Sequence, residues 1–531
     1  MAILSQRRGT LLPRNPVLHS QSLVSVGVVV LGLCVAWRAG RLIAAGDLTS
    51  DIYAALGVGV CAFALAIVKN WRAGLYIFVV WLVFEDLIRK YMGNNMVIYF
   101  AKDALVAITY FSFFASVKRR GAPFYRFPFL FVLSLFFWLG ILQCFNPGSP
   151  SLLYSLLGFK LYFYYIPLMF VGYALIRTDE DLRRFLTVNM GLAGAIAALG
   201  IVQSIIGPSF LNPAVLAPDI RGLSTLYRVA PISGASLYQP NSVFVSAGRF
   251  DMYLLLVWLL GLGSAGYLLL RRGRGQSIIF AALALVAVAA VMCGGRGALL
   301  YVLGSGLVLA AAFLWGAPWR WGQEYRLVKA IRRTVAVAGI AMLIAVCLFP
   351  VAVGARWSYY AETILPSSPK EQLTARLENY PVQEFEKAFA QGGWVFGHGI
   401  GTASLGVQYV SRWVDQHRPN FGVESGYGNI VLEYGIFGLF LWWLWTAALL
   451  ISAWKIVRKL RQTAYFPAAF AIFWFAFLIL YPMTYGTLSG YQDYIINAYL
   501  WLLIGILFRL PALAGEPARA VKSRGALLHG H

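Results

Sequence analysis

Long apolar stretches recur along almost the whole of this 531-residue chain and constrain its fold more than any other feature. About fourteen of them approach the roughly 20 residues that a helix needs to cross a bilayer. Charged residues make up 12% of the chain, against about 25% in soluble domains, so too few charges remain to solvate a globular surface. The sequence therefore predicts an all-α polytopic membrane protein. The expected spans are residues 22–37, 51–68, 73–88, 97–116, 127–144, 158–176, 185–206, 251–270, 277–293, 298–315, 334–353, 429–454, 464–482 and 492–508.

Basic residues gather in every second loop between these stretches, as in Lys118-Arg119-Arg120 and Arg271-Arg272-Gly273-Arg274. Because lysine and arginine are retained on the cytoplasmic side, this alternation predicts that both termini are cytoplasmic and that two long loops lie outside. The net charge of +23 would suggest a nucleic-acid partner for a soluble chain. Here it is explained by topology and anionic lipid headgroups, so membrane lipids and no nucleic acid are the expected partners.

The spans and loops divide the chain into six regions. The first apolar run lacks a small-residue cleavage site and is interpreted as a retained helix rather than a signal peptide. The two long outer loops are the segments most expected to carry function. The regions are an N-terminal bundle of about seven helices (1–206), an outer loop (207–250), membrane helices (251–353), a large outer loop (354–428), C-terminal membrane helices (429–508) and a cytoplasmic tail (509–531).

Metal and disulfide chemistry find little support in the sequence. All five cysteines lie in or at the ends of apolar runs, so neither a disulfide framework nor a zinc site is expected. The acidic run Asp179-Glu180-Asp181 could hold a metal ion. However, Thr178 with an aspartate three residues later is typical of a helix capping box, which we favour. We therefore expect no metal and no cofactor.

Arginines mark the outer ends of the central spans. Arg228 begins the segment RVAPISGASLYQPN, and Arg249 lies at the end of the same loop. Arg296 belongs to the sequence Cys293-Gly294-Gly295-Arg296-Gly297, where glycine allows a sharp turn. An arginine at the outer face opposes the positive-inside bias, so it either reaches lipid phosphate or forms an anion site.

Carboxylates accompany the large outer loop and the span that follows it. Glu424 precedes this span, and Glu433 lies within its apolar part, where an ionisable group is functional or paired. Glu424 is either a catalytic base or a residue that favours a helix N-terminus. His398 lies in the tight turn Gly397-His398-Gly399-Ile400-Gly401, where a structural role is the simpler interpretation.

A second set of charges lies nearer the N-terminus. Glu85-Asp86 ends one predicted span, and Lys102-Asp103 lies in the next. Because these helices are neighbours along the chain, we expect structural pairing between the two sets.

These motifs together resemble the O-antigen ligase and polymerase family of bacterial membrane proteins. The resemblance covers roughly residues 220–455 and consists of an ordered set of motifs. The set comprises Arg228, Gly234 and Pro240-Asn241; a Gly-Arg-Gly hairpin at Arg296; Arg376-Leu377; the Gly-x-Gly turn at 397–401; and the sequence from Glu424 through Tyr427, Leu432 and Glu433 to Gly435.

The resemblance implies a fold of the second GT-C type and a location in the bacterial cytoplasmic membrane. It implies that undecaprenyl-pyrophosphate-linked oligosaccharide is the donor and that a glycan or lipid is the acceptor, in a metal-independent inverting glycosyl transfer. Arg228 and Arg296 match the functional arginines of the family. Glu424-Ser425 stands where the ligases have His-Asn, which favours the polymerase or exopolysaccharide branch.

The expected site therefore has catalytic and substrate-binding members. Glu424, Arg296 and Arg228 are the expected catalytic residues, and Arg376, Tyr427, Arg249 and His398 are expected to bind substrate. A flippase and a chain-length regulator are further expected partners of such an enzyme. Two other functions fit a chain with this many spans: a secondary transporter, or a non-catalytic component of a polysaccharide assembly complex.

Overall fold

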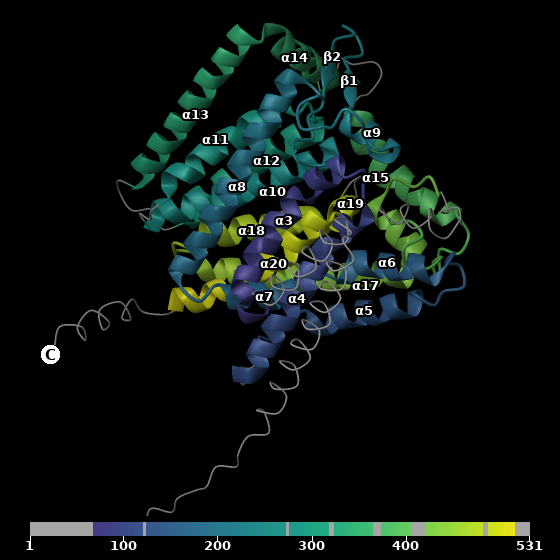
Figure 1. Cartoon of the computed structure of the whole chain (residues 1–531). Helices are drawn as coiled ribbons and strands as arrows, with labels where there is room; N and C mark the ends of the chain where they lie inside the picture. The colour runs from purple at the N-terminus through teal and green to yellow at the C-terminus, as the bar shows by residue number, and fades with distance from the viewer. Residues whose placement is uncertain are drawn as a thin grey trace, which may run out of the picture. The chain divides into compact units, whose positions relative to one another are not determined.

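The structure is a computed structural model that describes residues 67–120, 124–271, 275–317, 323–364, 373–404, 421–481 and 487–515. Within these residues the protein is mostly helical, and its sheet consists of two short strands. The predicted span 22–37, nearly all of span 51–68 and the region 516–531 lie outside the described residues. Figure 1 shows the helices, which are α3 (Trp71–Tyr91), α4 (Met96–Arg120), α5 (Leu130–Gln143), α6 (Leu152–Phe163), α7 (Leu168–Leu175), α8 (Asp179–Ile206), α9 (Pro218–Ser224), α10 (Ala247–Arg271), α11 (Gln276–Met292), α12 (Arg296–Gly316), α13 (Gln323–Leu348), α14 (Pro350–Ile364), α15 (Leu373–Ala390), α17 (Gly426–Leu460), α18 (Phe466–Leu480), α19 (Thr487–Gln492) and α20 (Tyr494–Gly515).

Seven helical segments of the described residues are long and apolar enough to cross a membrane. Three shorter apolar helices, α5, α11 and α18, occupy the predicted spans 127–144, 277–293 and 464–482. The structure therefore agrees with a membrane-embedded helical protein, and the total of fourteen spans stays a prediction. The seven segments are Met96–Lys118, Leu152–Leu175, Asp179–Ile206, Ala247–Arg271, Arg296–Gly316, Gly426–Leu460 and Tyr494–Gly515.

The chain divides into two compact units. One comprises Met1–Tyr76 with Ala104–Ser116, and the other comprises Ile77–Asp103 with Val117–His531. In the described part of the first unit, the rings of Trp71 and Phe113 lie edge to face with centroids 5.2 Å apart. The second unit contains every residue of the expected site.

Close helix contacts build the core of the second unit. A Cβ on Gly505 of α20 would lie 2.0 Å from the carbonyl oxygen of Met169 in α7, so only glycine allows the two backbones to approach this closely. Trp445 of α17 and Trp501 of α20 are fully buried and stack with ring centroids 5.9 Å apart. Large buried side chains of this kind contribute most of the apolar area that a helical core removes from solvent.

The outward side of α5 is strongly apolar. Phe131, Trp138 and Leu142 are 72%, 61% and 69% exposed, and their spacing places them along one stripe of the helix. A soluble protein seldom exposes such a stripe without a partner. On a membrane-embedded bundle, lipid is the natural partner of this face.

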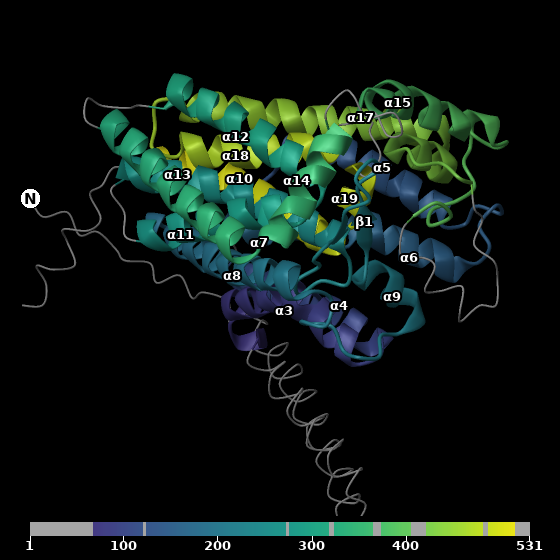
Figure 2. The same cartoon turned by 90° about the horizontal axis from the view of Figure 1, so that it is seen from above.

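The predicted outer loops contain regular structure. Residues 207–250 include α9 and a hairpin of β1 (Tyr227–Val229) and β2 (Ser236–Tyr238), in which Arg228 lies opposite Leu237. The predicted loop 354–428 contains most of α14 and all of α15. Figure 2 shows α9, β1 and α15 toward the same end of the second unit.

Candidate functional site

Arg228 lies on an exposed strand that is fastened to a distant turn. Its Nε donates a hydrogen bond to Oε1 of Gln239 at 3.2 Å. The side-chain amide of Gln239 in turn donates to the carbonyl of Gly294 at 2.8 Å. One neutral glutamine therefore connects the strand that carries Arg228 to the turn that precedes Arg296.

This turn, residues 293–295, requires both of its glycines. Gly294 has φ +71°, a left-handed conformation that side chains rarely adopt. A Cβ on Gly295 would lie 2.2 Å from Oδ2 of Asp251, so the Asp251 carboxylate packs directly against the backbone of the turn. The helix α12 then begins at Arg296, whose guanidinium carbon lies 5.7 Å from the ring centroid of Tyr359. Arg228 and Arg296 are thus both held beside this turn.

Helix α14 packs against the turn 293–295 and the neighbouring helix ends. Buried Arg356 donates hydrogen bonds to the carbonyls of Met292 at 2.8 Å and Ser204 at 2.8 Å, which joins the ends of α11 and α8. An arginine that satisfies several backbone carbonyls at once fixes the helix ends to which they belong. Tyr359, the neighbour of Arg296, is one turn further along α14.

A carboxylate from α14 also holds the tip of the β-hairpin. Oε2 of Glu362 accepts hydrogen bonds from the backbone N–H groups of Ile232 at 2.7 Å and Ser233 at 3.1 Å. The hydrogen bond with the Ser233 side chain, together with these backbone bonds, lowers the pKa of Glu362 below its usual value. Hydrogen bonds to the ionised form are the physical reason.

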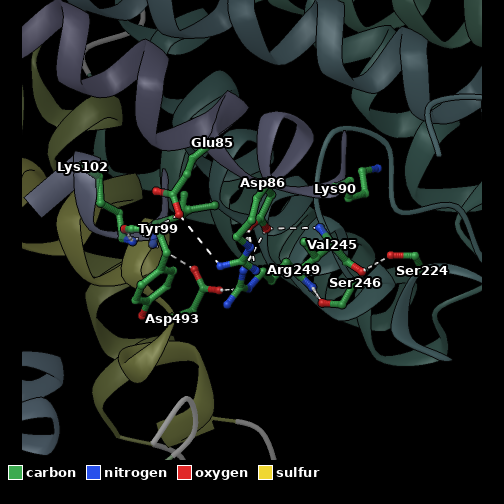
Figure 3. A network of polar contacts seen from close by, with 12 residues as sticks. Glu85, Asp86, Lys90, Tyr99, Lys102, Ser224, Val245, Ser246, Arg249 and Asp493 are labelled. Atoms are coloured by element: carbon green, nitrogen blue, oxygen red, sulfur yellow. Dashed lines mark hydrogen bonds and ion pairs between the residues drawn. The ribbon is translucent and has the colours of Figure 1, made fainter. Parts of the chain in front are cut away.

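Arg249 has a different environment (Figure 3). Its Nη1 lies 2.8 Å from Oδ2 and 3.0 Å from Oδ1 of Asp86, and its Nε lies 3.0 Å from Oδ2 of Asp493. The guanidinium also lies 4.8 Å from the ring centroid of Tyr494. Two carboxylates therefore compensate the charge of this arginine, and its contacts indicate a structural role.

The Arg249 pairs continue into a chain of buried ions. Arg89 lies 3.1 Å from Asp86, and Lys102 lies 3.2 Å from Glu85, with all four side chains 0% exposed. The expected pairing between the two acidic–basic sets is confirmed for Glu85 and Lys102. Asp86 instead pairs with arginines, and Asp103 pairs with Lys160 of α6.

Glu424 and Tyr427 lie at the start of α17. Ser425 is the N-cap, and its hydroxyl accepts a hydrogen bond from the N–H of Gly428. Glu424 precedes this cap, has an exposed side chain and donates its backbone N–H to Glu384 at 3.0 Å. Tyr427 is buried, and its hydroxyl donates to the carbonyl of Tyr481 at 2.6 Å, so this hydroxyl is engaged within the protein.

Helix α17 is broken at Gly435, which has φ +73°. The carbonyl of Leu432 accepts a hydrogen bond from the N–H of His398 at 2.7 Å. On the other side of the break, the N–H of Ile436 donates to the carbonyl of Trp394 at 3.0 Å. Residues 394–398 therefore fill the break and satisfy backbone groups that it would otherwise leave unpaired.

Glu433 fixes the continuation of that segment. Its Oε1 accepts hydrogen bonds from the N–H of Ala403 at 2.9 Å and from the hydroxyl of Ser404 at 2.5 Å. The side chain is completely buried, as expected for a charged residue within an apolar span. Both donors are neutral, and Oε2 of Glu433 is buried without a hydrogen-bond partner among the described residues, so the sequence's two alternatives for Glu433, functional or paired, are both kept.

His398 is confined by its neighbours. Its ring lies 4.9 Å from the ring of Phe421, and a Cβ on Gly393 would lie 3.2 Å from its Nε2. This buried nitrogen has no hydrogen-bond partner among the described residues. The contacts favour the structural role of His398. Arg376 lies in α15, and its side chain is outside the described residues.

In the structure, the aspartates of the acidic run 179–181 make hydrogen bonds within the protein. The hydroxyl of Thr178 accepts from the N–H of Asp181, whose carboxylate accepts from the N–H of Thr178, which confirms the predicted capping box. Asp179 accepts hydrogen bonds from the hydroxyls of Tyr267 and Tyr465. Within the described residues, no group of three or more His, Cys, Asp or Glu side chains could hold a metal ion.

The structure thus forms two groups from the expected residues. Arg228 and Arg296 belong to the group around the turn 293–295, whereas Glu424, Tyr427 and His398 belong to the group around the start of α17. Sequence reasoning missed Gln239 and Asp251, which connect the first group. A lone aspartate at the start of an apolar span was the available signal for Asp251. No protein-family model and no curated protein matches the chain.

Proposed function

We propose that this protein transfers or polymerises glycan from an undecaprenyl-pyrophosphate donor at the outer face of the bacterial cytoplasmic membrane. The observation that supports the proposal most is the placement of Arg228 and Arg296 beside one turn, where Arg228 contacts Gln239 and Arg296 lies over the ring of Tyr359. Two guanidinium groups at one place suit a pyrophosphate group, whose oxygens each planar fork can grip in pairs.

The proposed reaction is a direct displacement. An acceptor hydroxyl attacks the anomeric carbon of the donor, the bond from that carbon to the pyrophosphate oxygen breaks, and the hydroxyl proton passes to a base. Arg228 and Arg296 stabilise the charge that develops on the departing pyrophosphate. Glu424, exposed before the cap of α17, is the proposed base or orienting group for the hydroxyl.

Two features bear on whether the protein is a polymerase or a ligase, and on whether it is an enzyme or a transporter. Glu424 in place of the histidine that the ligases carry supports the polymerase branch. A secondary transporter of the broken-helix type leaves its helix break open to the substrate. Here the break at Gly435 is filled by residues 394–398. This contact supports an enzyme over a transporter of that kind.

Reconstitution with a lipid-linked oligosaccharide tests the proposal. A ladder of products on a gel indicates a polymerase, one shifted band indicates a ligase, and no product contradicts both. Glu424→Gln keeps the shape of the side chain and removes the base, so the rate should fall by roughly 10²-fold. Glu386→Gln on α15 is a matched control and should leave the rate unchanged. If Glu424→Gln is fully active, the residue acts only at the helix N-terminus.

A further inference from the structure

Lys90 is a buried lysine that lies between the two ends of the loop 207–250. It belongs to the last turn of α3 and is 1% exposed. Its Nζ donates to Oδ1 of Asn212 at 2.9 Å and to the carbonyl of Ser242 at 3.0 Å. These two residues are thirty positions apart and lie near the beginning and the end of the loop, so the Nζ of Lys90 joins both of its arms.

Both arms have an unfavourable backbone conformation at the point of attachment. Ser242 has φ +49°, and Leu211, next to Asn212, has φ +64°. Residues other than glycine rarely adopt positive φ, and such strain persists only where surrounding contacts enforce it. At Ser242 these contacts come from Gln203, which accepts its N–H at 2.6 Å, from Ile196, which accepts its hydroxyl at 2.8 Å, and from Lys90.

The neighbouring turn of α3 holds the same loop a second time. Oδ2 of Asp86 accepts a hydrogen bond from the N–H of Val245 at 3.1 Å, and the carbonyl of Val245 accepts from the hydroxyl of Ser224 at 2.7 Å (Figure 3). Asp86 and Lys90 are four residues apart and therefore share one face of α3. The loop 207–250 therefore packs against this face of α3 through both residues.

Further hydrogen bonds connect this face of α3 to the hairpin that carries Arg228. The amide of Asn212 donates to the carbonyl of Ser224 at 3.3 Å, and the hydroxyl of Tyr238 donates to the same carbonyl at 2.9 Å. Tyr238 pairs in the hairpin with Tyr227, the residue before Arg228. Every connection from Lys90 to the hairpin is thus either buried or part of the sheet.

We propose that Lys90 is a positioning residue, which locks both arms of the loop 207–250 onto α3 and so keeps Arg228 beside the turn 293–295. The locking itself is independent of any reaction. Its consequence for anion binding rests on the proposed function, because it assumes that Arg228 and Arg296 bind pyrophosphate together.

Lys90→Met tests the proposal on the full-length protein in lipid nanodiscs. Methionine keeps most of the length of the side chain and removes the terminal nitrogen with both hydrogen bonds. Trypsin cleavage after Arg221 and Arg228, both exposed, reports opening of the loop. We expect this cleavage to accelerate by roughly tenfold or more, since two buried hydrogen bonds are lost. Binding of inorganic pyrophosphate, measured by calorimetry, should weaken by roughly tenfold.

Two further variants complete the experiment. Lys387→Met removes an exposed lysine of α15 and should change neither readout. Asn212→Ala removes the hydrogen bond between the first arm and Lys90 together with the bonds of Asn212 to Ser224 and Tyr238. It lies outside the helices and should reproduce part of both effects even if Lys90→Met does not fold. Unchanged loop cleavage in Asn212→Ala and in folded Lys90→Met overturns the proposal.

Pyrophosphate binding separates this proposal from the proposed function. If the loop opens in Lys90→Met but the wild-type protein binds no pyrophosphate, the locking stands and the anion site is wrong. If the loop opens and pyrophosphate binding is as tight as in the wild-type protein, Lys90 does not position Arg228 for binding, and that part of the proposal is wrong.

Discussion

Arg249 and Arg228 belong to the same predicted loop region but have different partners. Arg249 lies between Asp86 and Asp493 in a chain of buried ions. Arg228 is exposed, and its hydrogen bond goes to a neutral amide. An arginine held between two buried carboxylates contributes mainly to the architecture, whereas an exposed arginine with one amide hydrogen bond stays accessible to a ligand. The partners of an arginine, rather than its position in the sequence, therefore indicate its role.

The largest expected effect is the loss of the buried ion pairs. Arg249→Ala leaves Asp86 buried without one of its main partners, and breaking a buried pair in this way costs about 3–5 kcal/mol. The thermal unfolding midpoint in detergent should fall sharply, whereas Arg228→Ala should leave it nearly unchanged. Equal midpoints for the two variants would remove the distinction between these arginines.

The next effect is on activity. Arg296→Ala should lower the rate of glycan transfer by about 10²- to 10³-fold, the usual cost of losing one group that stabilises developing charge. Arg296→Lys keeps the charge but loses the planar fork, so it should be impaired less. Both variants should unfold at the wild-type temperature. Normal transfer by both would mean that Arg296 contacts lipid phosphate and takes no part in the reaction.

A smaller effect is expected from the turn that carries Arg296. Gly295→Ala forces a Cβ to within 2.2 Å of the Asp251 carboxylate and should destabilise the protein by about 1–3 kcal/mol. Gly297→Ala is the matched control, because nothing lies within 4 Å of a Cβ there and alanine suits a helix better. Chemical denaturation of the two variants should give shifts of opposite sign.

The smallest expected effect depends on pH. Because the pKa of Glu362 is lowered in the folded protein, its contribution to holding the hairpin is complete above about pH 5, above the unfolded pKa. This contribution is lost as the pH falls through the folded pKa. Hydrogen exchange at Ile232 and Ser233, corrected for intrinsic rates, should accelerate in acid. In Glu362→Gln, whose amide oxygen still accepts hydrogen bonds but does not titrate, the corrected exchange of these two amides should not depend on pH.

The sequence predicted those parts of the fold that depend on local apolar pattern. The predicted spans 185–206, 251–270 and 492–508 lie close to α8, α10 and α20, because a long apolar run has few alternatives to a helix in lipid. The β-hairpin was not predicted. Its strands have three residues each and are held by tertiary contacts such as Glu362, which no local pattern encodes.

The site was predictable only in part. The resemblance pointed to Arg228 and Arg296, but the link through Gln239 joins residues 55 positions apart and has no sequence signature. Arg249 was assigned to substrate because its partner Asp86 lies 163 positions away. Pairings over such distances follow from the packing of helices, which spacing along one sequence does not reveal.

The filled break in α17 has a consequence for how segments of this protein can be exchanged. A Cβ on Gly397 would lie 2.6 Å from the carbonyl of Glu433, and one on Gly435 would lie 2.2 Å from that of Val395, so each side of the contact fits only the other. Residues 391–404 and 426–440 must therefore match each other, and a substitution in one segment restricts the other. A chimera that imports residues 391–404 from a distant homologue without residues 426–440 should misfold. Importing both segments together preserves the contact and should be tolerated.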